Sequence, residues 1–246
     1  MSALKKKDLF VKGLRIAWDD IAPDSYLRNI RTIAGINSLD FHSPITFFVG
    51  ENGSGKSTLL EAMAVAYGFN PEGGTVNYSF STYDSHSELC DAITLSKSFK
   101  KVYCGYYLRA ESFYNVATKE EEYSETEKDW KKLKLHKQSH GESFLTVMDE
   151  YFKSNGLFFL DEPEAALSPQ RQMTLLLKIA ESAKDNSQFF IVTHSPVLLT
   201  LPGAEILSFD NGSLHKIKYE DTESYRISEM FINHREQILK RLLDNC

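Results

Sequence analysis

Residues Gly50 to Ser57 read GENGSGKS and match the phosphate-binding loop pattern GxxxxGK[ST]. Glycines let the backbone of such a loop curl until its N–H groups face a phosphate, and the helix that follows adds positive potential. Lys56 can reach the β- and γ-phosphates of a nucleotide, and the Ser57 hydroxyl can bind Mg²⁺. The nucleotide contacts expected from this stretch are Gly50, Glu51, Asn52, Gly53, Ser54, Gly55, Lys56, Ser57 and Thr58.

Two carboxylates, Asp161 and Glu162, directly follow the apolar run from Leu157 to Leu160. In open α/β sheets, ligands bind at the carboxyl ends of the strands. We therefore expect Asp161 to bind Mg²⁺ and Glu162 to poise a water molecule as general base.

Two further polar turns can reach phosphate. His194 follows the apolar run 189–193, so in a neighbouring strand of the same sheet it could donate a hydrogen bond to the γ-phosphate or to the attacking water. Residues 139–143 read SHGES, with Ser139 as a helix cap and Glu142 three residues later. A helix N-terminus of this kind binds anions, and the phosphate need not belong to the same chain.

Alternating strands and helices must position these side chains. The apolar runs predict strands at 45–49, 101–109, 157–160 and 189–193, and helices at 58–67 and from Pro169 to about Lys184. A hairpin is expected around Asn211-Gly212, between residues 206–209 and 214–217. The apolar residues of a closing amphipathic helix are Ile227, Met230, Phe231, Ile238, Leu239 and Leu242. This order predicts an α/β layered domain around a largely parallel sheet.

The order of motifs resembles that of ATP-binding cassette (ABC) ATPases, as in transporters and in the SMC and DNA-repair branch. Residues 50–57 match Walker A, 138–142 the signature, 160–163 Walker B, 164–168 the D-loop, and His194 the switch histidine. The chain looks still more like a bacterial family of small stand-alone predicted ATPases. That likeness covers most of residues 26–243, in the segments FHSPITFFVGENGSGKSTLLEA, LRAESFYN, SHGESFL, FLDEPEAALSPQRQ and THSPVLLTLPGA.

The resemblance implies a P-loop NTPase fold with a mostly parallel sheet, flanking helices and an antiparallel β/helical subdomain. It implies one ATPase domain over 1–246, with a helical or lid insertion at about 70–150, and ATP and Mg²⁺ as cofactors. It further implies a head-to-head dimer in which Ser139 and Gly141 of one protomer contact ATP held by the other. Catalysis would fall to Glu162, His194 and Lys56.

The motifs also depart from the family pattern. The signature has His140 for Gly and Glu142 for Gln, and the D-loop ends in Ser168 instead of Asp. No Q-loop glutamine is evident; Glu111 is the nearest candidate and would join Ser57 and Asp161 at the metal.

The resemblance leaves the biological task open. The preferred interpretation is an ATPase that drives a protein effector such as a nuclease, and DNA is a further candidate partner. The process would be DNA repair or anti-phage defence. The alternatives are the ATPase subunit of a membrane transporter and a nucleotide-gated dimerisation switch with little turnover. For adenine recognition, Tyr26, Arg28 or Arg31 could stack on the base, or they could be a core aromatic and surface arginines.

Composition narrows the class of protein. The 246 residues carry 28 Lys and Arg against 34 Asp and Glu, a formal charge of −6, which argues against non-specific nucleic-acid binding by the whole surface. The three cysteines show no CxxC spacing, so neither a disulfide framework nor a zinc site is expected. No apolar run approaches the roughly 18 residues of a membrane helix, and no signal peptide is evident. We expect a cytoplasmic protein with no membrane partner.

The charge of the side chains changes sign along residues 119–137. The first part of this stretch is rich in acidic residues and the last part in basic residues. Such a run is typical of a solvated helix or mobile loop, and a docking surface for an acidic partner is the alternative. Weak, salt-sensitive DNA binding at Lys131, Lys132 and Lys134 is a hypothesis for this stretch.

Overall fold

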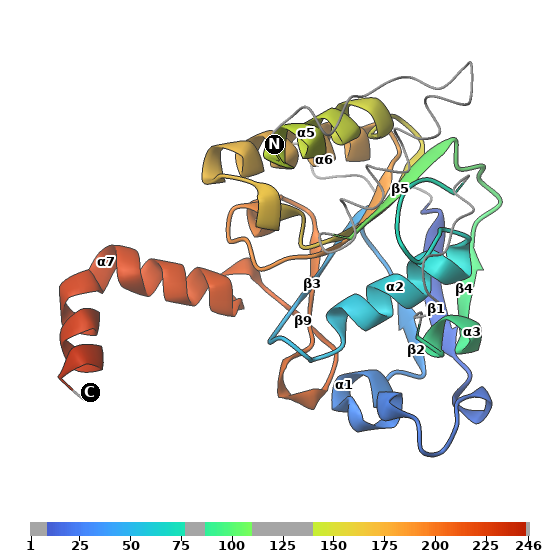
Figure 1. Cartoon of the computed structure of the whole chain (residues 1–246), viewed down its shortest axis with the longest axis horizontal. Coiled ribbons are helices and arrows are strands. Elements are labelled where there is room, and N and C mark those ends of the chain that lie inside the picture. Colours follow the sequence, from blue (N-terminus) through green and yellow to red (C-terminus); the bar gives the residue numbers. More distant parts are fainter. Residues whose placement is uncertain (1–8, 77–86, 110–139, 245–246) are drawn as a thin grey trace.

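The computed structural model of the chain describes residues 9–76, 87–109 and 140–244 (Figure 1). Within these ranges the strands form a six-stranded sheet in the order β5-β6-β7-β3-β8-β9 and a three-stranded sheet in the order β2-β1-β4. The larger sheet contains β3 Ile45–Val49, β5 Cys104–Arg109, β6 Gly156–Asp161, β7 Gln188–Val192, β8 Glu205–Ser208 and β9 His215–Ile217. The smaller sheet contains β1 Val11–Ile16, β2 Ser38–Asp40 and β4 Ile93–Lys97.

The helices are interspersed with the strands along the chain. The α-helices are α1 Arg31–Ala34, α2 Lys56–Tyr67, α3 Leu89–Ala92, α5 His140–Tyr151, α6 Pro169–Lys184 and α7 Glu223–Leu243. Short 3-10 turns are η1 Trp18–Asp20, η2 Tyr26–Asn29, η4 Pro163–Ala166, η5 Leu198–Thr200, η6 Asp210–Gly212 and η7 Tyr219–Asp221. As expected, α6 begins with Pro169, and the Ser168 hydroxyl caps it by accepting from the amide of Arg171.

The larger sheet is parallel from β5 to β8, and only its edge strand β9 runs antiparallel. The smaller sheet is antiparallel throughout. The predicted fold class, a mostly parallel α/β sheet with flanking helices and an antiparallel subdomain, is therefore confirmed.

Alternate side chains of the central strands enter two separate cores, because successive residues of a strand point to opposite faces. On β6 and β7, Phe159 and Phe190 stack at 5.3 Å between ring centroids on the face toward α2. On the opposite face, toward α5 and α6, Phe158 and Phe189 stack at 4.7 Å. Burial of each such side chain stabilises the fold by about 1.5–3 kcal/mol, so the sheet is a rigid base for the loops at its edge.

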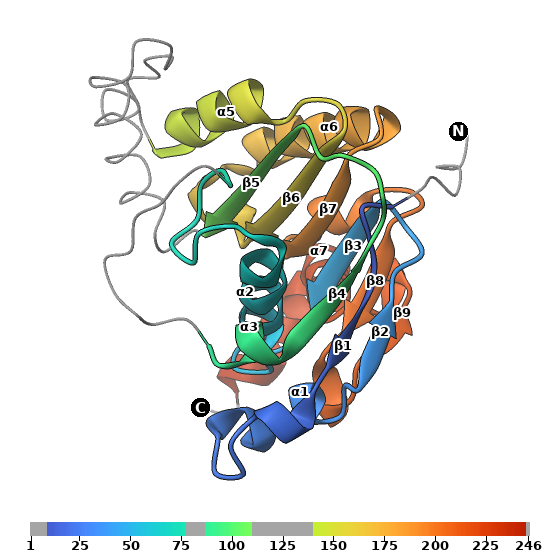
Figure 2. The ribbon, with the colours of Figure 1, turned by 90° about the vertical axis from the view of Figure 1, so that its right-hand side faces the viewer.

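The layers are clear in Figure 2: α5 and α6 cover one face of the larger sheet, and α2 lies between its other face and the smaller sheet. Gln188 joins the two sheets, because its side-chain amide pairs with both the N–H and the C=O of Val11 at 2.9 Å. This places the helix that follows the Gly-rich loop in the centre of the molecule.

Most expected elements are present, with shifted ends. Helix α2 begins at Lys56, two residues before the expected start, and β5 begins at Cys104 instead of residue 101. The hairpin of β8 and β9 forms around Asn211, whose φ of 59° is left-handed. An antiparallel subdomain was expected, but the positions of its strands β1, β2 and β4 were not predicted.

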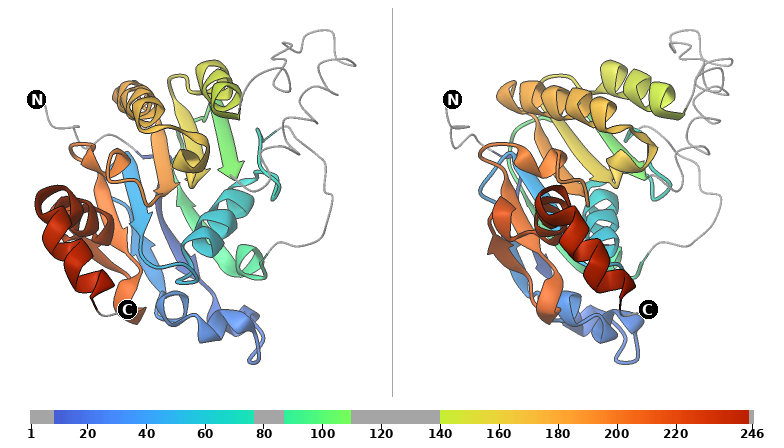
Figure 3. Two further views of the ribbon diagram at one scale, coloured as in Figure 1. Left: turned by 60° about the vertical axis from the view of Figure 1, so that its left-hand side comes forward. Right: turned by 90° about the vertical axis from the view of Figure 1, so that its left-hand side faces the viewer.

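Helix α7 is present as expected, but it bends at His234. None of its residues is buried, so its apolar side chains do not join the core, and Figure 3 shows the helix at the outer edge of the molecule.

Within the expected insertion at about 70–150, β4 and β5 are strands of the two sheets. Glu111, Ser139 and the charged run 119–137 lie outside the described residues, and the single-domain organisation stays a prediction.

Candidate functional site

The Gly-rich loop joins β3 to α2 at the carboxyl edge of the larger sheet, as its motif requires. Gly55 has a φ of +98°, and a Cβ there would lie 2.6 Å from Cγ1 of Ile33, so only glycine fits. At the start of the loop the Glu51 N–H donates to Asp210 Oδ1 at 2.9 Å. Asp210 lies in the turn between β8 and β9, and no sequence pattern indicates that it holds the loop.

Lys56 is the first residue of α2 and is only 4% exposed. Its Nζ donates to the carbonyl oxygens of Gly50 and Glu51, each at 2.7 Å, so the ammonium group spans the loop from inside. Burial lowers the pKa of Lys56, while the carboxylates of Glu162 and Asp210 act in the opposite direction. From the loop motif alone we would expect Lys56 to face solvent and to pack against no core; this expectation is wrong, because the side chain is buried.

Ser57 and Asp161 meet across the edge of the sheet. The Ser57 hydroxyl donates to Asp161 Oδ1 at 2.9 Å, and both side chains are accessible to solvent. A hydroxyl and a carboxylate at this separation are hard oxygen donors that suit Mg²⁺, which is usually bound by one or two protein groups together with phosphate and water. In the described part of the chain there is no cluster of three or more His, Cys, Asp or Glu that could hold a metal by itself. The pair therefore fits a Mg²⁺ that a phosphate group also binds.

Glu162 and His194 follow adjacent strands, β6 and β7, and face each other. Glu162 Oε1 lies 3.8 Å from His194 Nε2, and the two side chains are 44% and 43% exposed. Glu162 has a left-handed backbone with φ 48° and ψ 52°, an uncommon conformation for glutamate that costs about 1–3 kcal/mol. The Glu162 N–H is fixed by the Val192 carbonyl at 3.0 Å, which holds the strained turn in place.

Glu164 fixes the loop that carries the histidine. Its Oε1 accepts from the N–H groups of His194 at 2.6 Å and Ser195 at 3.1 Å. Burial raises the pKa of Glu164, and the hydrogen bonds of Thr193 and the His194 amide lower it in part. From the sequence, Glu164 could be assigned only to the D-loop, because a carboxylate that binds a distant backbone segment leaves no local pattern.

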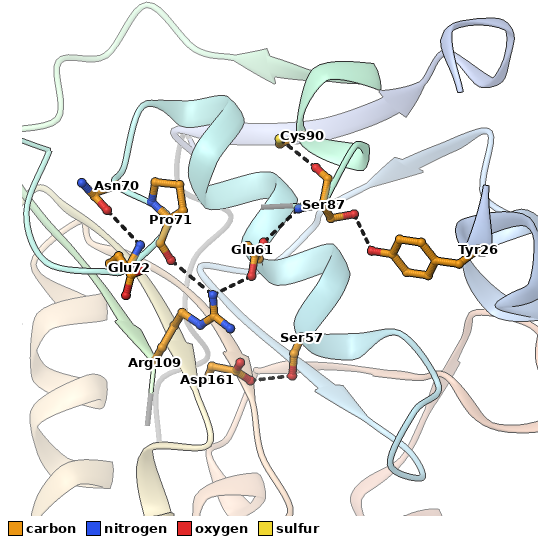
Figure 4. Close-up of polar contacts among 10 residues, drawn as sticks. All are labelled: Tyr26, Ser57, Glu61, Asn70, Pro71, Glu72, Ser87, Cys90, Arg109 and Asp161. Atoms are coloured by element: carbon orange, nitrogen blue, oxygen red, sulfur yellow. Dashed lines mark hydrogen bonds and ion pairs between the residues drawn. The ribbon is translucent and has the colours of Figure 1, made fainter. Parts of the chain in front are cut away.

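A polar network behind the site connects α2 to β5 (Figure 4). Arg109, at the end of β5, donates to Glu61 Oε2 at 2.7 Å and to the Pro71 carbonyl at 3.3 Å. Glu61 Oε1 accepts from the Ser87 N–H, and the Tyr26 hydroxyl donates to the Ser87 hydroxyl at 2.9 Å. Arg109 pairs in register with Asp161 on the neighbouring strand, so the network supports the same sheet edge.

A pocket of about 480 Å³ lies beside the Gly-rich loop. Its walls come from residues 29–32, from residues 51–54 and from the turn at 209–212, together with Glu223. Of the three side chains considered for base recognition, only Arg31 lines it. Arg28 instead binds the carbonyls of Trp18, Ile21 and Ala22.

The signature-like turn is described only from residue 140 onward, where α5 begins. Gly141 is buried, and a Cβ there would lie 2.5 Å from Arg171 Nη1 and 2.8 Å from the Ala166 carbonyl oxygen. Gly141 therefore packs against the D-loop region of its own chain. The structure brings together Lys56, Ser57, Asp161, Glu162 and His194, and it does not test Ser139 or Glu111.

The family described as AAA domain matches residues 26–190, two-thirds of the chain. Among curated proteins, none matches the chain.

The solved structures that are similar to this chain include the following three, each under 20% identical. The SMC head domain from Thermotoga maritima is 13% identical, with a TM-score of 0.45, over 85% of this chain and 99% of that one. The ATP-binding cassette of an ABC transporter is 15% identical, with a TM-score of 0.44, over 92% and 98%. A putative metal-chelate type ABC transporter in an inward-facing conformation is 16% identical, with a TM-score of 0.40, over 76% of each chain. In the described residues of the present chain, no helix is long and apolar enough to cross a membrane.

Proposed function

The chain belongs to the AAA domain family, and from this premise we propose that it is a Mg²⁺-dependent ATPase that binds and hydrolyses ATP at the edge formed by β3, β6 and β7. The observation that carries the proposal is the convergence of five side chains from three separate segments: Lys56, Ser57, Asp161, Glu162 and His194. Chance matches to the individual motifs would not bring these groups to one edge.

Each group has a separate task in the proposed reaction. Lys56 and the loop N–H groups bind the phosphates and stabilise the charge that develops on them. Glu162 accepts a proton from the water that attacks the γ-phosphate, which its exposed position permits. His194, held by Glu164 through its backbone, donates a hydrogen bond to the γ-phosphate or to that water.

Ser57 and Asp161 would hold Mg²⁺, and the ion when bound would neutralise charge on the phosphate oxygens. Their oxygen atoms are already 2.9 Å apart, so binding needs little rearrangement.

The pocket of about 480 Å³ beside the loop is the proposed site of the nucleoside. Pockets for small ligands usually measure about 300–1,000 Å³, so its size fits an adenosine. Arg31 is the side chain in its wall that could stack on the base, and backbone groups of 209–212 could supply hydrogen bonds. Tyr26 is less suited, since its hydroxyl is bound to Ser87.

A head-to-head dimer around two ATP molecules completes the proposed mechanism. The exposure of Glu162 and His194 supports it, because a second protomer could cover them. Since Gly141 is buried against Ala166 and Arg171, contact with the partner's nucleotide would fall mainly to the preceding Ser139. Movement between closed and open dimers would drive a protein effector such as a nuclease, or DNA, in repair or defence against phage.

Phosphate release tests the proposal directly. We expect Mg²⁺-dependent release of phosphate from ATP, and a loss of about 10²- to 10⁴-fold in kcat for Glu162→Gln. Glu181→Gln is a matched control, because Glu181 is an exposed carboxylate on α6, outside the site. Equal activity of the Glu162 variant and the control would contradict the assigned base, and no release by the wild type would leave the nucleotide-gated switch as the better proposal.

A further inference from the structure

Helix α2 makes two polar contacts with the carboxyl edge of the larger sheet, one helical turn apart. Ser57 and Glu61 are four positions apart, so both side chains lie on the same face of the helix. Ser57 donates to Asp161 Oδ1, on β6, at 2.9 Å. Glu61 Oε2 accepts from Arg109 Nη1, on β5, at 2.7 Å, and Figure 4 shows both contacts. The proposed Mg²⁺ ligands therefore lie one helical turn from an ion pair.

Arg109 lies next to Asp161 because β5 and β6 are adjacent parallel strands. The two residues are register partners, and neighbouring strands lie about 4.8 Å apart. Tyr107 and Phe159, two positions earlier on these strands, pack into the core on the α2 side. Side chains two positions apart share a face of the sheet, so Arg109 and Asp161 also point toward α2. Guanidinium and carboxylate groups form strong, bidentate pairs, so Arg109 can compete with a metal ion for Asp161 unless it is held elsewhere.

The contacts of Arg109 with Glu61 and Pro71 direct its guanidinium group toward α2 and the chain that follows this helix. The side chains of Arg109 and Glu61 are 25% and 12% exposed, so solvent screens their attraction only in part. The second oxygen of Glu61 accepts from the Ser87 N–H at 3.2 Å, which fixes the carboxylate. The Pro71 carbonyl accepts from Arg109 at 3.3 Å, longer than most hydrogen bonds of this kind. The contact with Glu61 is both shorter and charged, so it holds the guanidinium group more strongly.

We propose that Glu61 is a positioning residue that binds Arg109 and thereby keeps the carboxylate of Asp161 available to Mg²⁺, an inference that rests on the proposed metal site at Ser57 and Asp161. Without the charge of Glu61, the guanidinium group pairs with Asp161, its register partner, and a metal ion has to displace it. The apparent affinity of a ligand falls with the fraction of molecules that can bind it. A pair formed in roughly nine-tenths of the molecules therefore lowers Mg²⁺ affinity about tenfold.

A purely structural role for the ion pair predicts a different pattern of effects. If the pair only fastened α2 to β5, loss of either partner would have a similar effect, and loss of both would restore nothing. In the proposed role the effects are unequal, because removal of Glu61 releases a competing cation and removal of Arg109 eliminates it. The double substitution should therefore recover what the single Glu61 substitution loses.

Calorimetry with a non-hydrolysable ATP analogue tests the proposal without any reaction. The analogue is titrated once with Mg²⁺ and once with EDTA, and the ratio of the two affinities measures the gain from the metal. We expect Glu61→Gln to lower this gain at least roughly tenfold. Arg109→Gln and the double variant should keep the wild-type gain. Affinity in EDTA should be the same in every variant, because Lys56 and the loop N–H groups are unchanged.

Glu205→Gln is the matched control. Glu205 is also buried, pairs with Lys216 at 3.0 Å and accepts from the His42 N–H at 3.3 Å. It begins β8, at the edge of the sheet opposite the nucleotide site. Glu205→Gln should therefore lower the thermal midpoint, as Glu61→Gln does, and keep the full gain from Mg²⁺.

The single and double variants can each overturn the proposal. A wild-type gain in Glu61→Gln, or a double variant as weak as Glu61→Gln, would refute it. Arg109→Gln tests it even if Glu61→Gln does not fold, since a loss of the gain in that variant would show that Arg109 helps the metal to bind. A wild type with no gain from Mg²⁺ would overturn the proposed metal site and this inference with it, while analogue binding in EDTA would still support the phosphate loop.

Discussion

The hydroxyl of Ser57 lies 2.9 Å from Oδ1 of Asp161, although 104 positions separate the two residues in the chain. One follows β3 and the other ends β6, and β7 lies between these strands in the sheet. The contact therefore depends on the order of the strands in the sheet. This order brings Ser57 of one motif and Asp161 of the other together as a pair of oxygen ligands.

The pair predicts the metal dependence of nucleotide binding. Ser57→Ala and Asp161→Asn should each weaken Mg²⁺ binding in the presence of ATP by roughly 10- to 100-fold, because each removes or weakens one oxygen ligand. Metal titrations of ATPase activity would measure the change. As a control, Ser168→Ala removes a helix cap outside the site and should leave the metal dependence unaltered.

Lys56→Met should reduce ATP affinity by about 100-fold or more, since the loss of charged hydrogen bonds to phosphate costs roughly 1.5–3 kcal/mol each. Methionine keeps the buried aliphatic stem of Lys56, so the thermal midpoint of the protein without ATP should change little. Lys56→Ala should lower that midpoint as well, because it removes the stem. Calorimetry gives both quantities, and unchanged ATP affinity in Lys56→Met would refute the phosphate-loop assignment.

The motifs of the site could be predicted from the sequence more readily than the residues that hold them in place. The Gly-rich loop and the acidic turn after β6 are contiguous patterns with a direct chemical meaning, and the predicted parallel sheet followed from their flanking apolar runs. Glu164 and Asp210 could not be found in this way, because each binds backbone N–H groups of a segment 30 or more positions away. The strands of the smaller sheet were missed for a related reason: β1 is followed by polar turns and pairs with β4, about 80 residues later. The burial of Lys56 depends on loop carbonyls, which sequence patterns do not describe.

Gly141→Ala should destabilise the protein by about 1–3 kcal/mol, because the new methyl group would lie 2.8 Å from a backbone oxygen, that of Ala166. Gly35→Ala is the matched control: there the nearest atoms are 3.5 Å away, an ordinary contact. Denaturant unfolding of both variants compares the two positions. Equal stability of the variants would mean that α5 can shift away from the D-loop at little cost.

Glu164→Gln should change how stability depends on pH. Because the folded pKa of Glu164 lies above its ordinary value of 4.5, the folded state binds this proton more tightly than the unfolded state. This residue therefore lowers the free energy of unfolding as pH rises through the interval from 4.5 to the raised pKa. Glutamine keeps an acceptor for the His194 and Ser195 amides but does not titrate. The free energy of unfolding of the wild type minus that of the variant should fall across this interval, and a constant or rising difference would contradict the burial of this carboxyl group.

Glu162→Gln should trap the proposed ATP dimer. Glutamine keeps the size of the side chain but cannot accept the proton of the attacking water, so hydrolysis should slow by about 10²- to 10⁴-fold while Lys56 and Ser57 still bind ATP. ATP bound only by the dimer then stabilises it by mass action. Light scattering with Mg²⁺-ATP should detect a dimer that the wild type forms only transiently. Any association measured without nucleotide is subtracted as background.

Adding Ser139→Arg should abolish the ATP-dependent part of the association, since a bulky cation at the signature turn would clash with the other protomer's nucleotide. If Glu162→Gln shows no ATP-dependent association at saturating ATP, the composite site is wrong; if it hydrolyses ATP at the wild-type rate, Glu162 is not the base.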